Sequence, residues 1–234
     1  EQLIVFSQNG IKKLTGKTNS DFAILPITDD VGAIAPDTVQ EVGGDVMFLA
    51  ADGLRLLGAT ERIGDFSLAV VSKSIQPEFT KFTANSTSFS SVTIREKSQY
   101  RIFGYNAGFT DDAALGIIGT QFAAQGGEGM AWAETRGINS FVATSSYDSE
   151  TEFIYFANDD GYVYRLESGN SFDGGNISAT YQSPFFPVND PRIRKTFYKL
   201  ILYTEPSGGL SADVNLKLDF EKDLDFQPAS ITQV

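Results

Sequence analysis

The chain has 234 residues, which is long enough to bury a sizeable core in one large domain or two small ones. It contains no Cys and no His, so disulfides, thiolate metal sites and thiol nucleophiles are excluded, together with the usual general base near neutral pH. The formal net charge is −12, and residues 111–180 carry 2 basic and 11 acidic side chains, a balance unsuited to gripping nucleic acid through its phosphates.

No stretch of about 18 or more apolar residues is present, so we predict no membrane span. The first residues contain no Met and no basic region before the apolar run Leu3–Phe6, so they do not form a signal peptide. We therefore expect the chain to be a fragment or a processed piece of a longer protein. Its 22 Gly, 19 Phe and 9 Tyr predict an all-β protein rich in turns.

Four strand pairs joined by short turns recur along the chain. Three of them turn at Asn-Gly or Asp-Gly, which tolerate the positive φ angles of a type I′ turn and are the strongest short hairpin signals. The turns are Asn9-Gly10, Asp52-Gly53, Glu96-Lys97-Ser98 and Asp160-Gly161.

The spacing of these turns predicts a repeated unit. The first three fall near residues 10, 53 and 97, in steps of 43 and about 44 residues. A period of about 40–50 residues with strand pairs is typical of β-propeller blades, each a four-stranded sheet. An ordinary sandwich of meandering strands is the alternative. The longer step to residue 160 predicts an insertion at about 106–130, a loop-like stretch rich in Gly.

Further strands are predicted at 38–42, 131–134 and 140–144. Several strand runs are apolar on both faces, as expected for strands packed between neighbouring blades. Trp132, the single Trp, follows a glycine-rich run and is interpreted as a core anchor rather than a ligand platform.

The rhythm changes after Gly169. Residues 168–175 resemble a linker, and strands are predicted at 177–182, 197–204 and 212–220. The last run alternates Val214, Leu216, Leu218 and Phe220 with polar residues, which is typical of a half-buried strand. We predict propeller blades over 1–175, forming an incomplete ring, and a small antiparallel, β-sandwich-like module over 176–234.

Paired acids are the first candidates for chemistry. Asp29-Asp30, Asp111-Asp112 and Asp159-Asp160 are each adjacent in sequence, whereas glycosidases need carboxylates that face one another across a sugar. Turns or solvated loops explain these pairs better. Asn158-Asp159-Asp160-Gly161 lacks the alternating acids and the later Glu of an EF-hand.

Basic residues give no stronger signal. A propeller sialidase requires a convergent arginine cluster and Asp-box repeats, and we find no such box. Six arginines on or near predicted strands are interpreted as rim charges: Arg55, Arg62, Arg95, Arg101, Arg136 and Arg165. The run Arg192-Ile193-Arg194-Lys195 fits a contact with a neighbouring subunit or a phosphate, or a solvated loop. We therefore predict no catalytic, cofactor-binding or metal-binding residues and no enzyme activity.

Several runs resemble tailed-bacteriophage structural proteins of the tail nozzle and DNA-stabilisation type. The likeness extends over nearly the whole chain. Its residues are Phe6–Ile11, Gly32–Pro36, Gly44–Arg55, Ser72–Gln76, Asp160–Leu166, Gly169–Phe172 and Lys195–Leu200.

The resemblance implies a propeller-bearing subunit of the virion tail, arranged in a ring of identical subunits beside adaptor or other tail proteins, and guiding and retaining DNA. If the acidic region lines a channel, like-charge repulsion would let DNA slide without sticking. Asp111, Asp112, Glu150 and Glu152 are the acids expected there. The alternatives are a receptor-binding or fibre-attachment component that presents aromatic loops to a host glycan, and a propeller glycosidase.

Overall fold

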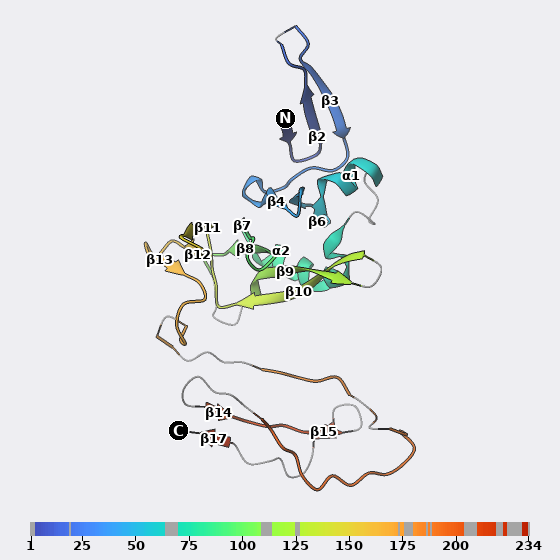
Figure 1. The fold of residues 1–234 in the computed structure, drawn as a ribbon, viewed down its shortest axis with the longest axis vertical. Helices are drawn as coiled ribbons and strands as arrows, with labels where there is room; N and C mark the ends of the chain where they lie inside the picture. The colour runs from blue at the N-terminus through green and yellow to red at the C-terminus, as the bar shows by residue number, and fades with distance from the viewer. Residues whose placement is uncertain are drawn as a thin grey trace. The chain divides into compact units, whose positions relative to one another are not determined.

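The computed structural model describes residues 3–18, 20–63, 70–108, 114–124, 127–172, 174–175, 180–185, 187, 189–203, 210–218, 222–223 and 231–233. The chain divides into two compact units, Glu1–Glu167 and Ser168–Val234 (Figure 1). The division falls at the start of the linker-like run 168–175.

The described residues of the first unit form four antiparallel sheets, each a meander of consecutive strands, which confirms the all-β class. The first sheet contains β1 (Leu3–Phe6), β2 (Ile11–Thr15) and β3 (Ala23–Thr28), and the second contains β4 (Gln40–Val42), β5 (Asp45–Ala50) and β6 (Gly53–Leu56). The third contains β7 (Ser88–Ile94), β8 (Gln99–Tyr105), β9 (Ala114–Ala124) and β10 (Gly127–Arg136). The fourth contains β11 (Val142–Asp148), β12 (Thr151–Ala157) and β13 (Val163–Arg165).

All four predicted hairpins are confirmed: β1–β2, β5–β6, β7–β8 and β12–β13 are antiparallel pairs. The Asp52-Gly53 turn shows why Gly is needed. Gly53 has φ of +143°, and a Cβ on it would lie 2.5 Å from Ser72 Oγ and 2.7 Å from a Val70 methyl group. Both the backbone conformation and the close approach of the following segment therefore require Gly at this turn.

The loop-like structure predicted for 106–130 is wrong for most of the part that the structure describes. Most of that part belongs to the long β9–β10 hairpin, which completes the four-stranded third sheet. Its glycines serve packing rather than a loop: Gly119 pairs with Trp132, and a Cβ on Gly119 would lie 2.6 Å from the Trp132 ring. Gly in a strand often marks such a close approach.

Helical segments connect the second and third sheets and were not predicted. They are α1 (Leu57–Ile63), η3 (Val71–Ile75) and α2 (Gln76–Asn85), and a further 3-10 turn, η1 (Pro36–Thr38), precedes β4. In α2, Phe79 and Phe82 enter the core, and Ile75 packs against the same cluster. Their helical spacing was a signal for this helix in the sequence.

The four sheets pack against one another in chain order. Successive side chains of the inner strands point to opposite faces, so that one side chain contacts the preceding sheet and the next contacts the following sheet. In β5, Met47 and Leu49 join a core cluster with Tyr100 and Ile102 of the third sheet. Phe48 and Ala50 join another cluster with Ile11 and other residues of the first sheet. This double-sided burial confirms the expectation from strands that are apolar on both faces.

The third sheet repeats the pattern. Tyr100 and Ile102 of β8 face the second sheet, whereas Phe103 and the β7 residues Val92 and Ile94 cluster with Ile154 of the fourth sheet. We call this arrangement of the first, second, third and fourth sheets the four-sheet stack. Among the residues that the structure describes, the stack does not close into a propeller ring.

The second unit contains short strands: β14 (Leu210–Ala212) pairs with β17 (Ile231–Gln233), and β15 (Lys217–Leu218) pairs with β16 (Lys222–Asp223). The predicted strand at 197–204 is wrong for 197–203, and residue 204 lies outside the described residues. Of the other predicted strands, 180–182 and 213–216 are not in strands, and 177–179 and 219–220 are outside the described residues. Aromatic and aliphatic runs favour a strand only where another strand accepts their backbone hydrogen bonds.

Candidate functional site

The paired acids that the structure describes have structural partners or lie in solvent. Asp29 and Asp30 are exposed after β3. Asp159 accepts a hydrogen bond from the Tyr105 hydroxyl at 2.5 Å, and this bond, with burial, raises the pKa of Tyr105. Asp160 accepts hydrogen bonds from the Tyr164 hydroxyl at 2.6 Å and the Tyr162 N–H at 2.8 Å, and both lower the pKa of Asp160. Asp111 and Asp112 lie outside the described residues.

The arginines do not converge on one pocket. Arg55 is 1 % exposed and forms a two-pronged contact with Asp52, Nε to Oδ1 at 3.0 Å and Nη2 to Oδ2 at 2.6 Å. In the third sheet Arg136 pairs with Glu134 at 3.2 Å. In the fourth sheet the Arg165 guanidinium lies 5.2 Å from the centre of the Phe153 ring. These side chains belong to different sheets and neutralise or cover local groups.

In the part of the chain that the structure describes, no group of three or more acidic side chains is arranged to hold a metal ion. Within the same residues, every helix is too short or too polar to cross a membrane. Trp132 packs against the core cluster, in agreement with its interpretation as an anchor.

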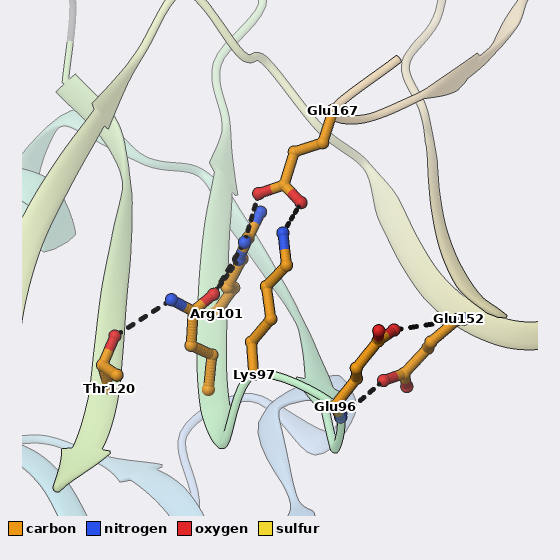
Figure 2. A network of polar contacts seen from close by, with 7 residues as sticks. Glu96, Lys97, Arg101, Thr120, Glu152 and Glu167 are labelled. Carbon is orange, nitrogen blue, oxygen red and sulfur yellow. Dashed lines mark hydrogen bonds and ion pairs between the residues drawn. The ribbon is translucent and has the colours of Figure 1, made fainter.

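The most extensive polar contacts join the third sheet to the fourth and centre on Glu167, directly after β13. Figure 2 shows Lys97 and Arg101 pointing toward the Glu167 carboxylate. Lys97 donates to one oxygen, and Arg101 Nη2 donates to the other at 2.5 Å. Arg101 also donates to Gln99 Oε1 at 2.6 and 3.1 Å, and the Gln99 amide donates to Thr120 Oγ1 at 3.0 Å.

This Glu167 network is electrostatically favourable for the ionised carboxylate. Partial burial raises the pKa of Glu167, but the hydrogen bonds from Lys97 and Arg101 outweigh it, so that the pKa lies below the ordinary value. The charge of Arg101, whose side chain is 6 % exposed, is thereby balanced at the junction of the two sheets.

A second contact between the same sheets is reciprocal. The Glu96 N–H donates to Glu152 Oε2 at 3.0 Å, and the Glu152 N–H donates to Glu96 Oε2 at 3.4 Å (Figure 2). Glu152 is 8 % exposed and also accepts a hydrogen bond from the Tyr147 hydroxyl at 3.4 Å. The prediction that Glu152 faces a channel is therefore wrong, because its carboxylate binds the β7–β8 turn. Sequence offered no signal for this, since the contact exists only once the two sheets have packed.

The two ends of the four-sheet stack each leave one sheet face uncovered within the first unit. Strand alternation places Leu3, Val5, Lys12, Leu14, Ile24 and Pro26 on the outer face of the first sheet, which we call the first end face. Leu3, Val5 and Ile24 are 59 %, 51 % and 66 % exposed. Three apolar side chains of this face are therefore more than half exposed, and Lys12 lies between Val5 and Pro26.

The outer face of the fourth sheet, which we call the last end face, carries both apolar and polar side chains. It contains Val142, Thr144, Ser146, Asp148, Thr151, Phe153, Tyr155, Ala157, Val163 and Arg165. Val142 and Val163 are 56 % and 73 % exposed. The sequence offered no signal for either end face, because strands that are apolar on both faces are expected to be covered by neighbouring sheets.

The basic run in the second unit is partly engaged. Arg192 forms hydrogen bonds with the Asp190 carboxylate at 2.9, 3.1 and 3.2 Å, and these lower the pKa of Asp190. Lys195 Nζ donates to the carbonyl oxygens of Pro187 and Asp190 at 2.7 and 2.6 Å. Local contacts therefore involve two of its three cations.

No protein-family model matches the chain, and no curated protein matches it with significance. The described residues of the first unit form four packed sheets, and apolar side chains are exposed on both end faces.

Proposed function

We propose that this chain is a non-catalytic structural subunit of a bacteriophage tail, of the nozzle or DNA-stabilisation type. The observation that carries the proposal is the face-to-face order of four antiparallel meanders in the four-sheet stack. Propeller blades are consecutive meanders packed face to face, although the typical blade has four strands and, among the described residues, only the third sheet does. The resemblance of runs such as Gly44–Arg55 and Asp160–Leu166 to tail nozzle proteins supports the assignment to a bacteriophage tail.

In this proposal the four sheets are blades of a β-propeller, and the second unit is a small sandwich-like module. The inner blades pack against another blade on each face. The Glu167 network and the Glu96–Glu152 contact join the last two blades, so that the stack would form a stiff part of a channel wall. Such a wall suits a tail component that meets identical subunits and neighbouring tail proteins and must withstand the passage of DNA.

The acidic region supports a wall that does not bind DNA. Residues 111–180 carry 11 acidic and 2 basic side chains, so a surface formed by them repels phosphates. Glu152 is not available for this role because it is buried between sheets. The acids that remain for a channel are Asp111, Asp112 and Glu150, of which Glu150 is exposed in the β11–β12 turn.

The test is DNA release and retention by particles that carry Asp111→Asn, Asp112→Asn and Glu150→Gln together. We expect slower release, because a neutral wall no longer repels the phosphates. A matched control neutralises three exposed acids from the first part of the chain, Asp29→Asn, Asp30→Asn and Glu41→Gln, and should leave release unchanged. Equal behaviour of the two triple variants would contradict the channel role, and absence of the chain from purified tails would contradict the structural role.

A receptor-binding component of the tail is the second candidate, and exposed aromatic residues favour it. Tyr181, Tyr198 and Tyr203 of the second unit are 91 %, 94 % and 89 % exposed. Aromatic rings with this exposure suit stacking on sugars. Glycan-array binding by the wild-type chain, lost in Tyr198→Ala, would favour this function over the channel wall.

A further inference from the structure

Two carboxylates meet at the junction of the third and fourth sheets. Glu96 lies in the β7–β8 turn, and Glu152 is the second residue of β12. Each side chain reaches the backbone of the other residue: Glu96 Oε2 lies 3.4 Å from the Glu152 nitrogen, and Glu152 Oε2 lies 3.0 Å from the Glu96 nitrogen (Figure 2). The packing of the two sheets therefore brings two negative charges into one small region.

One oxygen of Glu152 is buried without a partner. The residue is 8 % exposed, and its Oε1 atom forms no hydrogen bond. The other oxygen, Oε2, accepts hydrogen bonds from the Glu96 N–H and from the Tyr147 hydroxyl. An ionised oxygen that is buried without a donor or a cation is costly, and in a folded protein such an atom often marks a bound ion or water molecule.

The described residues provide no cation that pairs with these two carboxylates. Neither Glu96 nor Glu152 forms an ion pair, and Lys97, the next residue in the turn, pairs with another carboxylate. Burial and the charge of Glu152 raise the pKa of Tyr147, the charge of Glu96 adds to this effect, and Arg95 opposes it. Both carboxylates thus act on the same hydroxyl group, with one arginine nearby that is bonded to neither.

We propose that Glu96 and Glu152 bind a hard divalent cation of the Ca²⁺ class, which joins the third sheet to the fourth. The Oε1 atoms of the two carboxylates are its ligands, the Tyr147 hydroxyl lies beside them, and water completes the coordination. Ca²⁺ prefers oxygen ligands and tolerates an irregular arrangement of them better than Mg²⁺ does. Because only two carboxylates contribute, we expect weak binding, with a Kd of about 1 mM. The inference goes beyond the proposed function and does not rest on it.

The test is thermal unfolding of the full chain in about 10 mM CaCl₂, compared with NaCl of the same ionic strength and with EDTA. We expect CaCl₂ to raise the Tm of the wild type by roughly 3–6 °C above the value in NaCl. Glu152→Gln should lose this shift, because it removes the buried charge. Glu150→Gln, an exposed acid outside the contact, is the matched control and should keep the full shift.

A second variant and a second measurement keep the test decisive if Glu152→Gln does not fold. Glu96 is exposed, so Glu96→Gln should fold and should raise the CaCl₂ concentration that gives half of the shift by roughly tenfold. Tb³⁺ occupies Ca²⁺ sites and luminesces when a neighbouring tyrosine absorbs light. Tyr147→Phe should therefore remove most of the Tb³⁺ signal, and excess CaCl₂ should displace it from the wild type.

Several results would overturn the inference. Equal Tm values of the wild type in CaCl₂ and in NaCl of the same ionic strength would show that only screening acts. A full shift in Glu96→Gln or in Glu152→Gln would show that the cation binds elsewhere. Loss of the shift in Glu150→Gln would show that it depends on the overall negative charge rather than on this junction.

Discussion

Two runs of similar composition have opposite fates in the two units. Gln99–Tyr105 of the first unit is strand β8, hydrogen-bonded to β7 and β9 and buried along most of its length. Phe197–Tyr203 of the second unit belongs to no described strand, and Tyr198 and Tyr203 are 94 % and 89 % exposed. The difference shows that a run with high β propensity forms a strand only when neighbouring strands hydrogen-bond its backbone and neighbouring sheets pack against its side chains.

Truncating one isoleucine in each run should give the largest difference in stability between the two runs. Ile102 is 0 % exposed in β8, so Ile102→Ala should lower the free energy of unfolding by about 3 kcal/mol through lost burial and a residual cavity. Ile201 is 53 % exposed, so Ile201→Ala should change it by less than about 0.5 kcal/mol. Urea denaturation measures both. Equal losses would mean that Phe197–Tyr203 is buried in solution.

Replacing one glycine in each unit should give a smaller difference in stability between the two units. Gly53→Ala forces a Cβ against Ser72 at a positive φ and should cost about 2–3 kcal/mol. Gly169 also has a positive φ, but nothing lies within 4 Å of its Cβ position, so Gly169→Ala should cost about 1 kcal/mol from backbone strain alone. Thermal unfolding of the two variants gives the comparison, and a larger loss for Gly169→Ala would contradict the close packing at the Asp52-Gly53 turn.

The Glu167 network should give the smallest effect, at the point where the first unit ends. Folding lowers the pKa of Glu167 below its ordinary value of 4.5. The network therefore stabilises the fold at pH values above 4.5, and this stabilisation is lost as the pH falls through the pKa of the folded state. Glu167 is 41 % exposed, so solvent screening limits the contribution to about 0.5 kcal/mol.

Glu167→Gln should therefore lower stability at pH 7 slightly and flatten the loss below pH 4.5. The measurement is the urea midpoint from pH 3 to pH 7. Glu150→Gln, in an exposed turn outside the network, is the control and should retain the wild-type pH dependence. An unchanged pH profile in Glu167→Gln would indicate that the contact between the third and fourth sheets contributes nothing in solution.

Sequence predicted the features that depend on a few neighbouring residues. Asn9-Gly10 and Asp160-Gly161 located hairpins because turn geometry restricts which residues occupy it. The β9–β10 hairpin was missed because Gly116 and Gly119 resemble loop residues. Only close packing explains them: Thr135 and Phe103 lie against Gly116, and Trp132 lies against Gly119. The burial of Glu152 was also missed, since it depends on which sheets meet.

The two-sided burial of β5 has a consequence for how this chain tolerates change. Met47 and Leu49 contact the third sheet, whereas Phe48 and Ala50 contact the first. Adjacent residues of β5 therefore pack against different partners: Ile11 precedes Phe48 by 37 residues, and Tyr100 follows Leu49 by 51 residues. Compensating substitutions should consequently alternate along the strand, odd positions with the sheet that follows and even positions with the sheet that precedes.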